Sequence, residues 1–274
     1  MAGAPDLSIP SLFDVQGKTA IVTGGGSGIG EMIATAFVQN GVKVYIASRK
    51  EKQLKEVSER LTKMGPGYCH YFVADISSKE GCDKLADAVK QRENKIHILV
   101  NNSGMSWGAP YENVPEKEGW DRVLALNVKS IFYLTVAFTD LLAKDSTNID
   151  PGRVINVSSI AGVSPVAQGS KVAGPSSGLW SYHTSKAAVT LASKRITVNA
   201  ILPGIFPSKM TAFGFKLAGG QDQMAEGHPW GRVGNARDLA GVVLFLVSPA
   251  GSYVTASHIA IDGGSLYAPG KAFL

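Results

Sequence analysis

A tyrosine and a lysine four residues apart are the side chains in this sequence best suited to move a proton. Tyr182 and Lys186 stand at positions i and i+4, which places both on one face of a helix. A free phenol titrates near pH ~10, and a neighbouring ammonium stabilises the phenolate, so the phenol can exchange a proton nearer neutrality. Such a pair is common by chance and usually only a surface pair. Ser158 and Ser159 support a catalytic interpretation, because they follow an apolar stretch at a sheet edge where ligands bind.

A glycine-rich run near the N-terminus could bind a phosphorylated cofactor. It extends over Thr23–Gly30 and separates an apolar stretch of strand length from a stretch with helical periodicity. Glycines permit a tight turn and a close approach of the backbone to a pyrophosphate, whose charge the helix N-terminus meets. Alone, such a run could be a mere loop. Its position between a strand and a helix favours a dinucleotide site.

The end of the second apolar stretch indicates which dinucleotide would fit. An NAD site usually carries an acidic residue there, which binds the ribose 2′-hydroxyl. This chain has Ser48, Arg49 and Lys50 instead. An arginine can bind a 2′-phosphate through paired hydrogen bonds, whereas a carboxylate would repel it. The alternative is that Arg49 and Lys50 are solvated charges that open a helix. We predict NADP(H) as the cofactor.

Apolar stretches of strand length alternate with helical periodicity along the whole chain. This alternation requires right-handed crossovers and a parallel sheet that is covered on both faces. We therefore predict an α/β fold, a Rossmann-like doubly wound parallel sheet in a single domain over 1–274. A long helix is expected over 117–144, and strands are expected over 18–23, 42–48, 68–75, 96–101, 153–158, 197–202 and 258–261.

Composition and charge narrow the class of protein. Hydrophobic residues make up 45% and charged residues 18% of the 274 residues, which is typical of a compact globular protein. The net charge of +5 favours acidic partners such as phosphorylated cofactors or acidic carrier proteins. No basic run indicates nucleic acid, and no apolar run indicates a membrane. Cys69 and Cys82 have neither a metal nor a disulfide spacing, and no cluster predicts a metal site. A cytoplasmic enzyme is expected.

Taken together, these motifs resemble the short-chain dehydrogenase/reductase family. The resemblance covers about residues 15 to 266, and further stretches at 105–108, 206–211 and 261–264 resemble 3-oxoacyl reductases of the rhamnolipid-pathway type. The motifs that carry it follow the family order and are Thr23–Gly30, Asn101–Gly104, Asn127, Ser159, Tyr182 with Lys186, and Pro203 with Gly204.

The resemblance implies an NADPH-dependent reduction of a ketone, with a 3-oxoacyl thioester as a candidate substrate. Tyr182 would protonate the carbonyl oxygen, which Ser159 would polarise, and Lys186 would hold the nicotinamide ribose and lower the pKa of Tyr182. Asn127 would organise a water that links Lys186 to solvent, with a capping or packing role as the alternative. The residues implied to bind NADP(H) are Thr23, Gly24, Ser27, Gly28, Ile29, Gly30, Ser48, Arg49, Asp75, Ile76, Asn102, Ser103, Gly104, Tyr182, Lys186, Pro203, Gly204 and Ser208.

Two departures from the family pattern flank the Tyr182–Lys186 pair. The insert 163–179 is rich in Gly, Ser and Pro, so we expect an irregular loop, either over the active-site mouth or as a surface insertion. After Lys186 only nine residues (187–195) precede the next strand. A helix over 181–193 would lack about nine residues, roughly 13 Å, relative to the family.

The short helix bears on partners and activity. In the family this helix and the one that carries Asn127 form the main dimer interface, so a homo-oligomer is expected from the resemblance but loses part of its contact surface. The alternative function is a catalytically impaired NADPH-binding protein. We also predict an extended N-terminal segment at 1–14 and a substrate loop at 205–230.

Overall fold

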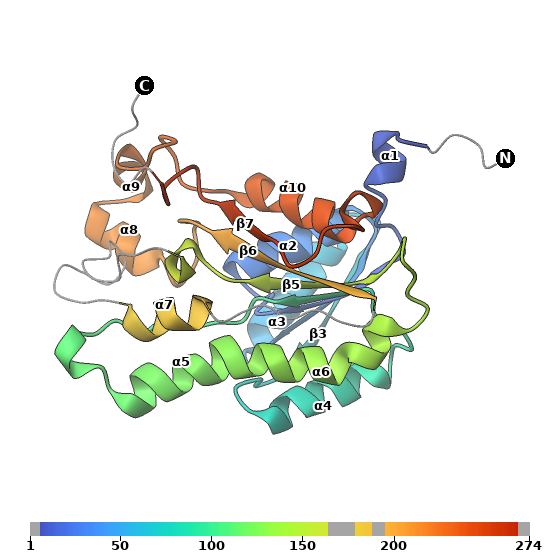
Figure 1. Cartoon of the computed structure of the whole chain (residues 1–274), viewed down its shortest axis with the longest axis horizontal. Coiled ribbons are helices and arrows are strands. Elements are labelled where there is room, and N and C mark those ends of the chain that lie inside the picture. The colour runs from blue at the N-terminus through green and yellow to red at the C-terminus, as the bar shows by residue number, and fades with distance from the viewer. Residues whose placement is uncertain (1–5, 164–178, 188–194, 268–274) are drawn as a thin grey trace.

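A seven-stranded parallel sheet forms the centre of the computed structural model (Figure 1). The structure describes residues 6–163, 179–187 and 195–267. The strands follow the order β3-β2-β1-β4-β5-β6-β7, and every neighbouring pair is parallel. The predicted doubly wound, Rossmann-like sheet is therefore confirmed. The strands are β1 (Thr19–Thr23), β2 (Lys43–Ser48), β3 (Tyr68–Val73), β4 (Ile98–Asn101), β5 (Gly152–Val157), β6 (Ile196–Pro203) and β7 (His258–Ile261).

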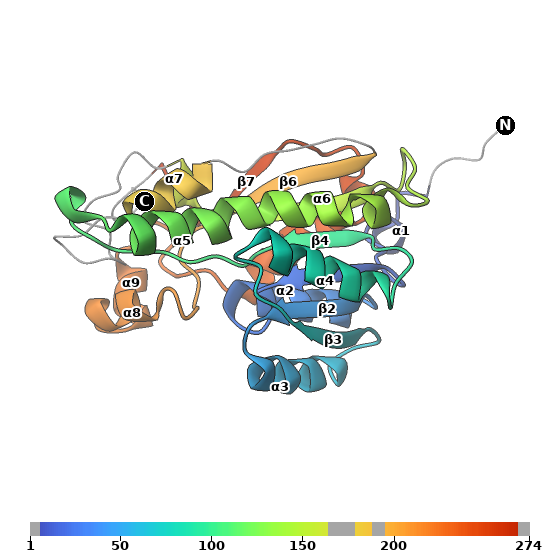
Figure 2. The same cartoon turned by 90° about the horizontal axis from the view of Figure 1, so that it is seen from below.

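Helices cover both faces of the sheet, and the sheet separates the core into two layers (Figures 1 and 2). Successive strand residues point to opposite faces, so Ile21 packs in one layer and its neighbour Val22 in the other. Strands buried on both sides consist of apolar residues throughout, which explains the continuous apolar runs in the sequence. The helices on the Val22 side are α2 (Gly28–Gln39), α3 (Glu51–Thr62) and α10 (Ala236–Val247). Those on the Ile21 side are α4 (Lys79–Lys90) and α6 (Ser130–Ala143).

The long helix expected over 117–144 extends over Glu116–Ala143 and alternates between π-helical and α-helical winding. It consists of the π-helical segment η2 (Glu116–Asp121), one α-helical turn α5 (Arg122–Leu124), the π-helical segment η3 (Ala125–Lys129), and α6. In a π-helical segment each N–H bonds five residues back, which shifts the side chains that follow, and such segments are frequent at functional sites. Asn127 lies in η3.

This helix is, within the described part of the chain, the only one long and apolar enough to cross a membrane by length and composition. It runs beside α4 along one face of the sheet (Figure 2). Its side chains Leu134, Phe138 and Leu142 are fully buried in the core layer on that face. Packing against the sheet therefore accounts for the apolar side chains on this face, whereas Phe132 and Val136 of the same helix are exposed.

Several predicted loop segments contain short helices. The segment 1–14, expected to be extended, includes α1 (Ile9–Leu12), because Pro10 is compatible with the first turn of a helix. The segment 205–230 contains α8 (Ala212–Ala218) and α9 (Gln221–Glu226). Single 3₁₀ turns occur elsewhere in the chain, at η1 (Tyr111–Asn113), η4 (Ile160–Gly162) and η5 (Pro249–Gly251).

The segments around the predicted catalytic pair are described only in part. The helix expected over 181–193 is seen as α7 (Trp180–Ala187), and residues 188–194 lie outside the described residues. Most of the predicted insert, 164–178, also lies outside them. The continuation of the helix past Ala187 and the irregular loop over 164–178 therefore remain predictions.

Candidate active site

The predicted site residues gather at the carboxyl ends of the parallel strands. Thr23 ends β1, Asn101 ends β4, Val157 ends β5 and Pro203 ends β6. Residues that follow these four positions therefore meet at one edge of the sheet, which is where open α/β sheets bind ligands. The edge unites the glycine-rich loop with the tyrosine-lysine pair, although they are far apart in sequence.

The glycine-rich loop has a backbone that larger residues would not tolerate. Gly24 and Gly28 have φ angles of +66° and +57°, which favour glycine. A Cβ at Gly30 would lie 2.6 Å from the carbonyl oxygen of Gly24. Ser27 is the N-cap of α2, but its side chain makes no capping hydrogen bond, so the first N–H groups of the helix remain open to an anion. The loop fits a dinucleotide pyrophosphate.

Hydrogen bonds hold this loop against the segment that follows β4. The Thr23 hydroxyl accepts from the backbone N–H groups of Asn102 and Ser103, both at 3.0 Å. It donates to the carbonyl of Val100 at 3.3 Å. In turn, the Asn102 side-chain amide donates to the carbonyl of Thr23 at 2.8 Å. The two predicted cofactor-binding segments therefore form one rigid unit.

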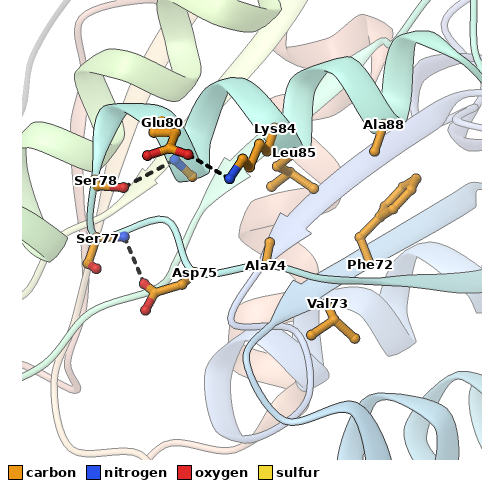
Figure 3. Close-up of a pocket in the computed structure, with 11 residues that line it drawn as sticks. Phe72, Val73, Ala74, Asp75, Ser77, Ser78, Glu80, Lys84, Leu85 and Ala88 are labelled. Carbon is orange, nitrogen blue, oxygen red and sulfur yellow. Dashed lines mark hydrogen bonds and ion pairs between the residues drawn. The ribbon is translucent and has the colours of Figure 1, made fainter.

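Arg49, which was predicted to bind the 2′-phosphate of NADP(H), lies just beyond the end of β2. Ser48 ends β2, and the Arg49 side chain beyond it is 72% exposed, with its Nη1 4.0 Å from Oδ2 of Asp75. The Ser77 N–H donates to Asp75, beside a pocket between the end of β3 and α4 (Figure 3). The hydrogen bond from Ser77, and then Arg49, hold the pKa of Asp75 below its usual value. Next to it, Ile76 is buried. The loosely held guanidinium fits a phosphate.

The Ser159 side chain lies close enough to the Tyr182 hydroxyl to influence its pKa. Burial raises the pKa of Tyr182, and the Ser159 side chain opposes that rise. This corrects the predicted lowering by Lys186. The Lys186 Nζ lies 5.6 Å from the centre of the Tyr182 ring, donates to the carbonyl of Val157 at 2.8 Å, and has a pKa lowered by burial to about 8. Burial is therefore the main cause of the pKa shift of both Tyr182 and Lys186.

Asn127 uses its side chain on the protein itself. Its Oδ1 accepts from the N–H of Met105 at 2.9 Å, and its Nδ2 donates to the Met105 carbonyl at 2.8 Å. The same Nδ2 also donates to the Ser185 hydroxyl at 2.9 Å. A Cβ at Gly104 would lie 3.3 Å from Oδ1 of Asn127 and 3.5 Å from Nζ of Lys186. Gly104 thus lets these two predicted catalytic residues approach each other.

The segment after β6 completes the edge. A Cβ at Gly204 would lie 2.9 Å from Cα of Asp262, so only glycine fits between β6 and the turn after β7. Ser208 lies over the glycine-rich loop, with its Cβ 3.0 Å from the position a Cβ would take at Gly28. The geometry therefore brings Ser208 to the predicted cofactor site.

Two serines beside the predicted residues, Ser158 and Ser185, were not among the catalytic or cofactor-binding residues predicted from the sequence. The Ser158 hydroxyl donates to the carbonyl of Lys186 at 2.6 Å, and the Ser185 hydroxyl donates to that of Tyr182 at 2.8 Å. Their position next to Ser159 and Lys186 was the signal available, but the partners are set by tertiary contacts. No cluster of His, Cys, Asp or Glu able to hold a metal occurs among the residues the structure describes.

Comparisons with known proteins identify the family of this chain. A family model described as enoyl-(acyl carrier protein) reductase matches residues 24–265. The rhamnolipids biosynthesis 3-oxoacyl-[acyl-carrier-protein] reductase of Pseudomonas aeruginosa is 36% identical over 92% of this chain and 97% of its own length. The short-chain dehydrogenase/reductase PhomF of Diaporthe leptostromiformis is 30% identical over 96% of each chain.

Solved structures lead to the same group. The RhlG/NADP active-site complex of Pseudomonas aeruginosa superimposes with a TM-score of 0.82 at 34% identity, over 93% of this chain and 98% of that one. The family model and the two relatives each span most of the chain, and they cover the glycine-rich loop as well as the tyrosine-lysine pair. This chain belongs to the short-chain dehydrogenase/reductase family.

Proposed function

We propose that this protein reduces a ketone to a secondary alcohol with NADPH, and that a 3-oxoacyl thioester is its substrate class. The observation that carries the proposal is the position of Lys186 beside the Tyr182 ring, with Ser159 near the phenol and the glycine-rich loop at the same sheet edge. The substrate class is supported by the 3-oxoacyl reductase of Pseudomonas aeruginosa, whose similarity extends over nearly the whole chain.

The cofactor assignment rests on the residues of the first half of the sheet edge. The open N–H groups at the start of α2 would hold the pyrophosphate, and Arg49 would hold the 2′-phosphate. Asp75 and Ile76 would contact the adenine, Asn102 to Gly104 would line the cofactor, and Ser208 would hold the carboxamide. The bound cofactor supplies the hydride. The solved complex of the Pseudomonas aeruginosa relative with NADP supports this choice.

Proton transfer falls to Tyr182. Burial keeps its pKa raised, so the phenol carries its proton at neutral pH, which is the state that a proton donor requires. The hydroxyls of Ser159 and Tyr182 would both donate to the substrate carbonyl oxygen and so polarise it. Lys186, with a pKa of about 8, is mainly cationic at neutral pH and would stabilise the phenolate that remains.

The route by which Tyr182 regains its proton is a second part of the proposal. Because the side-chain amide of Asn127 is occupied by Met105 and Ser185, a water near Lys186 would have to bind backbone groups of η3 rather than that amide.

We also propose that the protein forms a homo-oligomer. The exposed apolar residues Phe132 and Val136 lie on α6, in the helix that the family resemblance assigns to the interface.

The decisive experiment follows NADPH oxidation by the purified protein with acetoacetyl thioester. We expect turnover in the wild-type protein and a loss of about 10²- to 10⁴-fold in Tyr182→Phe, because only the donated proton is removed. Tyr253→Phe is the control, since Tyr253 is fully exposed and should leave the rate unchanged. NADPH fluorescence should report binding in all three proteins.

Two outcomes would overturn the proposal. Equal turnover in wild type and Tyr182→Phe would remove Tyr182 as the proton donor. NADPH binding without turnover on the acetoacetyl thioester and on simple ketones would favour the alternative, a catalytically impaired NADPH-binding protein.

A further inference from the structure

A serine inside the Tyr182–Lys186 turn connects the cofactor-lining segment to the catalytic helix. Ser185 is fully buried, and its hydroxyl accepts from Nδ2 of Asn127 at 2.9 Å and donates to the carbonyl of Tyr182 at 2.8 Å. We propose that Ser185 is a positioning residue, which sets Tyr182 relative to Met105 and thereby to the cofactor-lining segment that ends at Gly104. This inference rests on the proposed reductase function.

The direction of every hydrogen bond in this connection is fixed by the Met105 backbone. Its N–H donates to Oδ1 of Asn127 and its carbonyl accepts from Nδ2, so the amide of Asn127 has one allowed orientation. The Ser185 oxygen must then act as acceptor toward Nδ2, and its single proton is left for the Tyr182 carbonyl. No alternative arrangement satisfies these groups equally, so the connection resists rotation of any one side chain.

The ties on α7 differ in where they lead. The Ser158 hydroxyl and the Val157 carbonyl both connect Lys186 to the end of β5. Ser185 is bound through Asn127 to Met105, which follows the cofactor-lining segment after β4. Loss of the β5 ties would loosen the lysine, whereas loss of Ser185 would loosen the helix relative to the cofactor. A displacement of only ~1 Å at a reacting group can cost about a hundredfold in rate.

Ser181, on the same helix, offers a matched control. It is as fully buried as Ser185, and it lies one turn away. Its hydroxyl has no hydrogen-bond partner among the described residues, so Ser181→Ala removes the same atom without breaking a connection. The two serines thus separate the loss of a buried hydroxyl from the loss of this particular link.

The experiment compares Ser185→Ala, Ser185→Thr and Ser181→Ala by kcat, KM and NADPH affinity, each normalised to the folded fraction. For Ser185→Ala we expect kcat to fall at least about tenfold, with KM for the acetoacetyl thioester and the Kd of NADPH within about twofold. Ser185→Thr retains the hydroxyl and should recover most of the rate. Ser181→Ala should match the wild type within about twofold.

A double-mutant cycle tests whether Ser185 acts through Asn127. If it does, Ser185→Ala should cost little further rate in an Asn127→Ala background. An unchanged kcat in folded Ser185→Ala, or equal losses in Ser185→Ala and Ser181→Ala, would overturn the inference while the reductase function stands. No turnover in the wild-type protein would overturn the proposed function, and this inference with it.

Discussion

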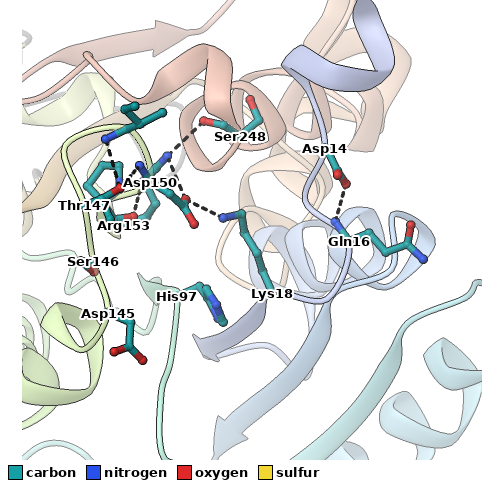
Figure 4. Close-up of polar contacts among 12 residues, drawn as sticks. Asp14, Gln16, Lys18, His97, Asp145, Ser146, Thr147, Asp150, Arg153 and Ser248 are labelled. Carbon is teal, nitrogen blue, oxygen red and sulfur yellow. Dashed lines mark hydrogen bonds and ion pairs between the residues drawn. The ribbon is translucent and has the colours of Figure 1, made fainter. Parts of the chain in front are cut away.

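Charged side chains lie at both ends of the parallel strands, but they are held in different ways. At the amino ends, Lys18 and Arg153 share one carboxylate oxygen of Asp150, at 2.7 and 3.7 Å, and His97 lies beside them (Figure 4). The fully buried Arg153 also donates to the carbonyls of Pro151 and Ser248. These contacts connect the starts of β1, β4 and β5 to the end of α10.

At the carboxyl ends the charges have weaker partners. Lys186 is nearly buried and bonds a neutral carbonyl, that of Val157, while burial lowers its pKa to about 8. Arg49 is mostly exposed and reaches Asp75 only at 4.0 Å. A buried charge without a charged partner costs free energy, and such groups are frequent at functional sites, whereas an exposed charge is solvated and stays available to a ligand. Paired charges at the amino ends thus connect elements of the fold, whereas the less firmly paired charges at the carboxyl ends belong to the proposed site.

The largest contrast is expected between two lysines. Lys186→Met should reduce turnover by about 10²- to 10⁴-fold, because the phenolate of Tyr182 would lose its cation. Lys18→Met should leave turnover within about twofold and lower the free energy of unfolding by at most about 1 kcal/mol, since its partner Asp150 is half exposed. Steady-state kinetics and urea unfolding of both variants measure this. Comparable losses of rate in the two variants would abolish the distinction between the two ends.

A smaller contrast is expected between two arginines. Arg49→Ser should raise KM for NADPH about tenfold to a hundredfold and leave KM for NADH unchanged, because only the 2′-phosphate loses charge-assisted hydrogen bonds. Arg153→Lys should keep the ratio of NADPH to NADH and lower the melting temperature, because a fixed set of buried contacts is disturbed. The measurement is kcat/KM with each cofactor. Equal effects of Arg49→Ser on both cofactors would place the 2′-phosphate elsewhere.

These contrasts also explain what the sequence could predict. Tyr182 and Lys186, and the glycine-rich loop, were found because helical spacing and strand-loop-helix order are local patterns. The link from Met105 through Asn127 to Ser185 was not predicted, because it joins three segments that only the fold brings together. The pKa of Tyr182 was predicted in the wrong direction, since its burial depends on tertiary packing.

The charge cluster at the amino ends was missed for the same reason. Lys18 is far from Asp150 and Arg153 in the chain, and each of the three alone resembles an ordinary surface charge in the sequence. Strand boundaries were also approximate. The strand expected over 96–101 extends over Ile98–Asn101, although the His97 backbone just before it still bonds Thr19 and Arg153.

The smallest effect is expected at His97, which accepts from the N–H of Thr19 at 2.9 Å through Nδ1 and is therefore neutral. Burial, then Lys18 and Lys95, lower its pKa from 6.5 to about 4. Between these two pH values the unfolded chain holds a proton on His97 that the folded chain lacks. Its contribution therefore makes stability fall as pH drops from about 6.5 towards 4.

His97→Asn isolates this titration from the surrounding charges. Asparagine supplies an acceptor to Thr19 without titrating, and Lys18 and Asp150 are left in place. Urea unfolding midpoints at pH 7, 6 and 5 should therefore decline less in His97→Asn than in the wild-type protein. Parallel declines would mean that the carboxylates, and not His97, govern the acid sensitivity of the amino ends. Turnover at pH 7 should be equal in the two proteins, because this end of the sheet holds no part of the proposed site.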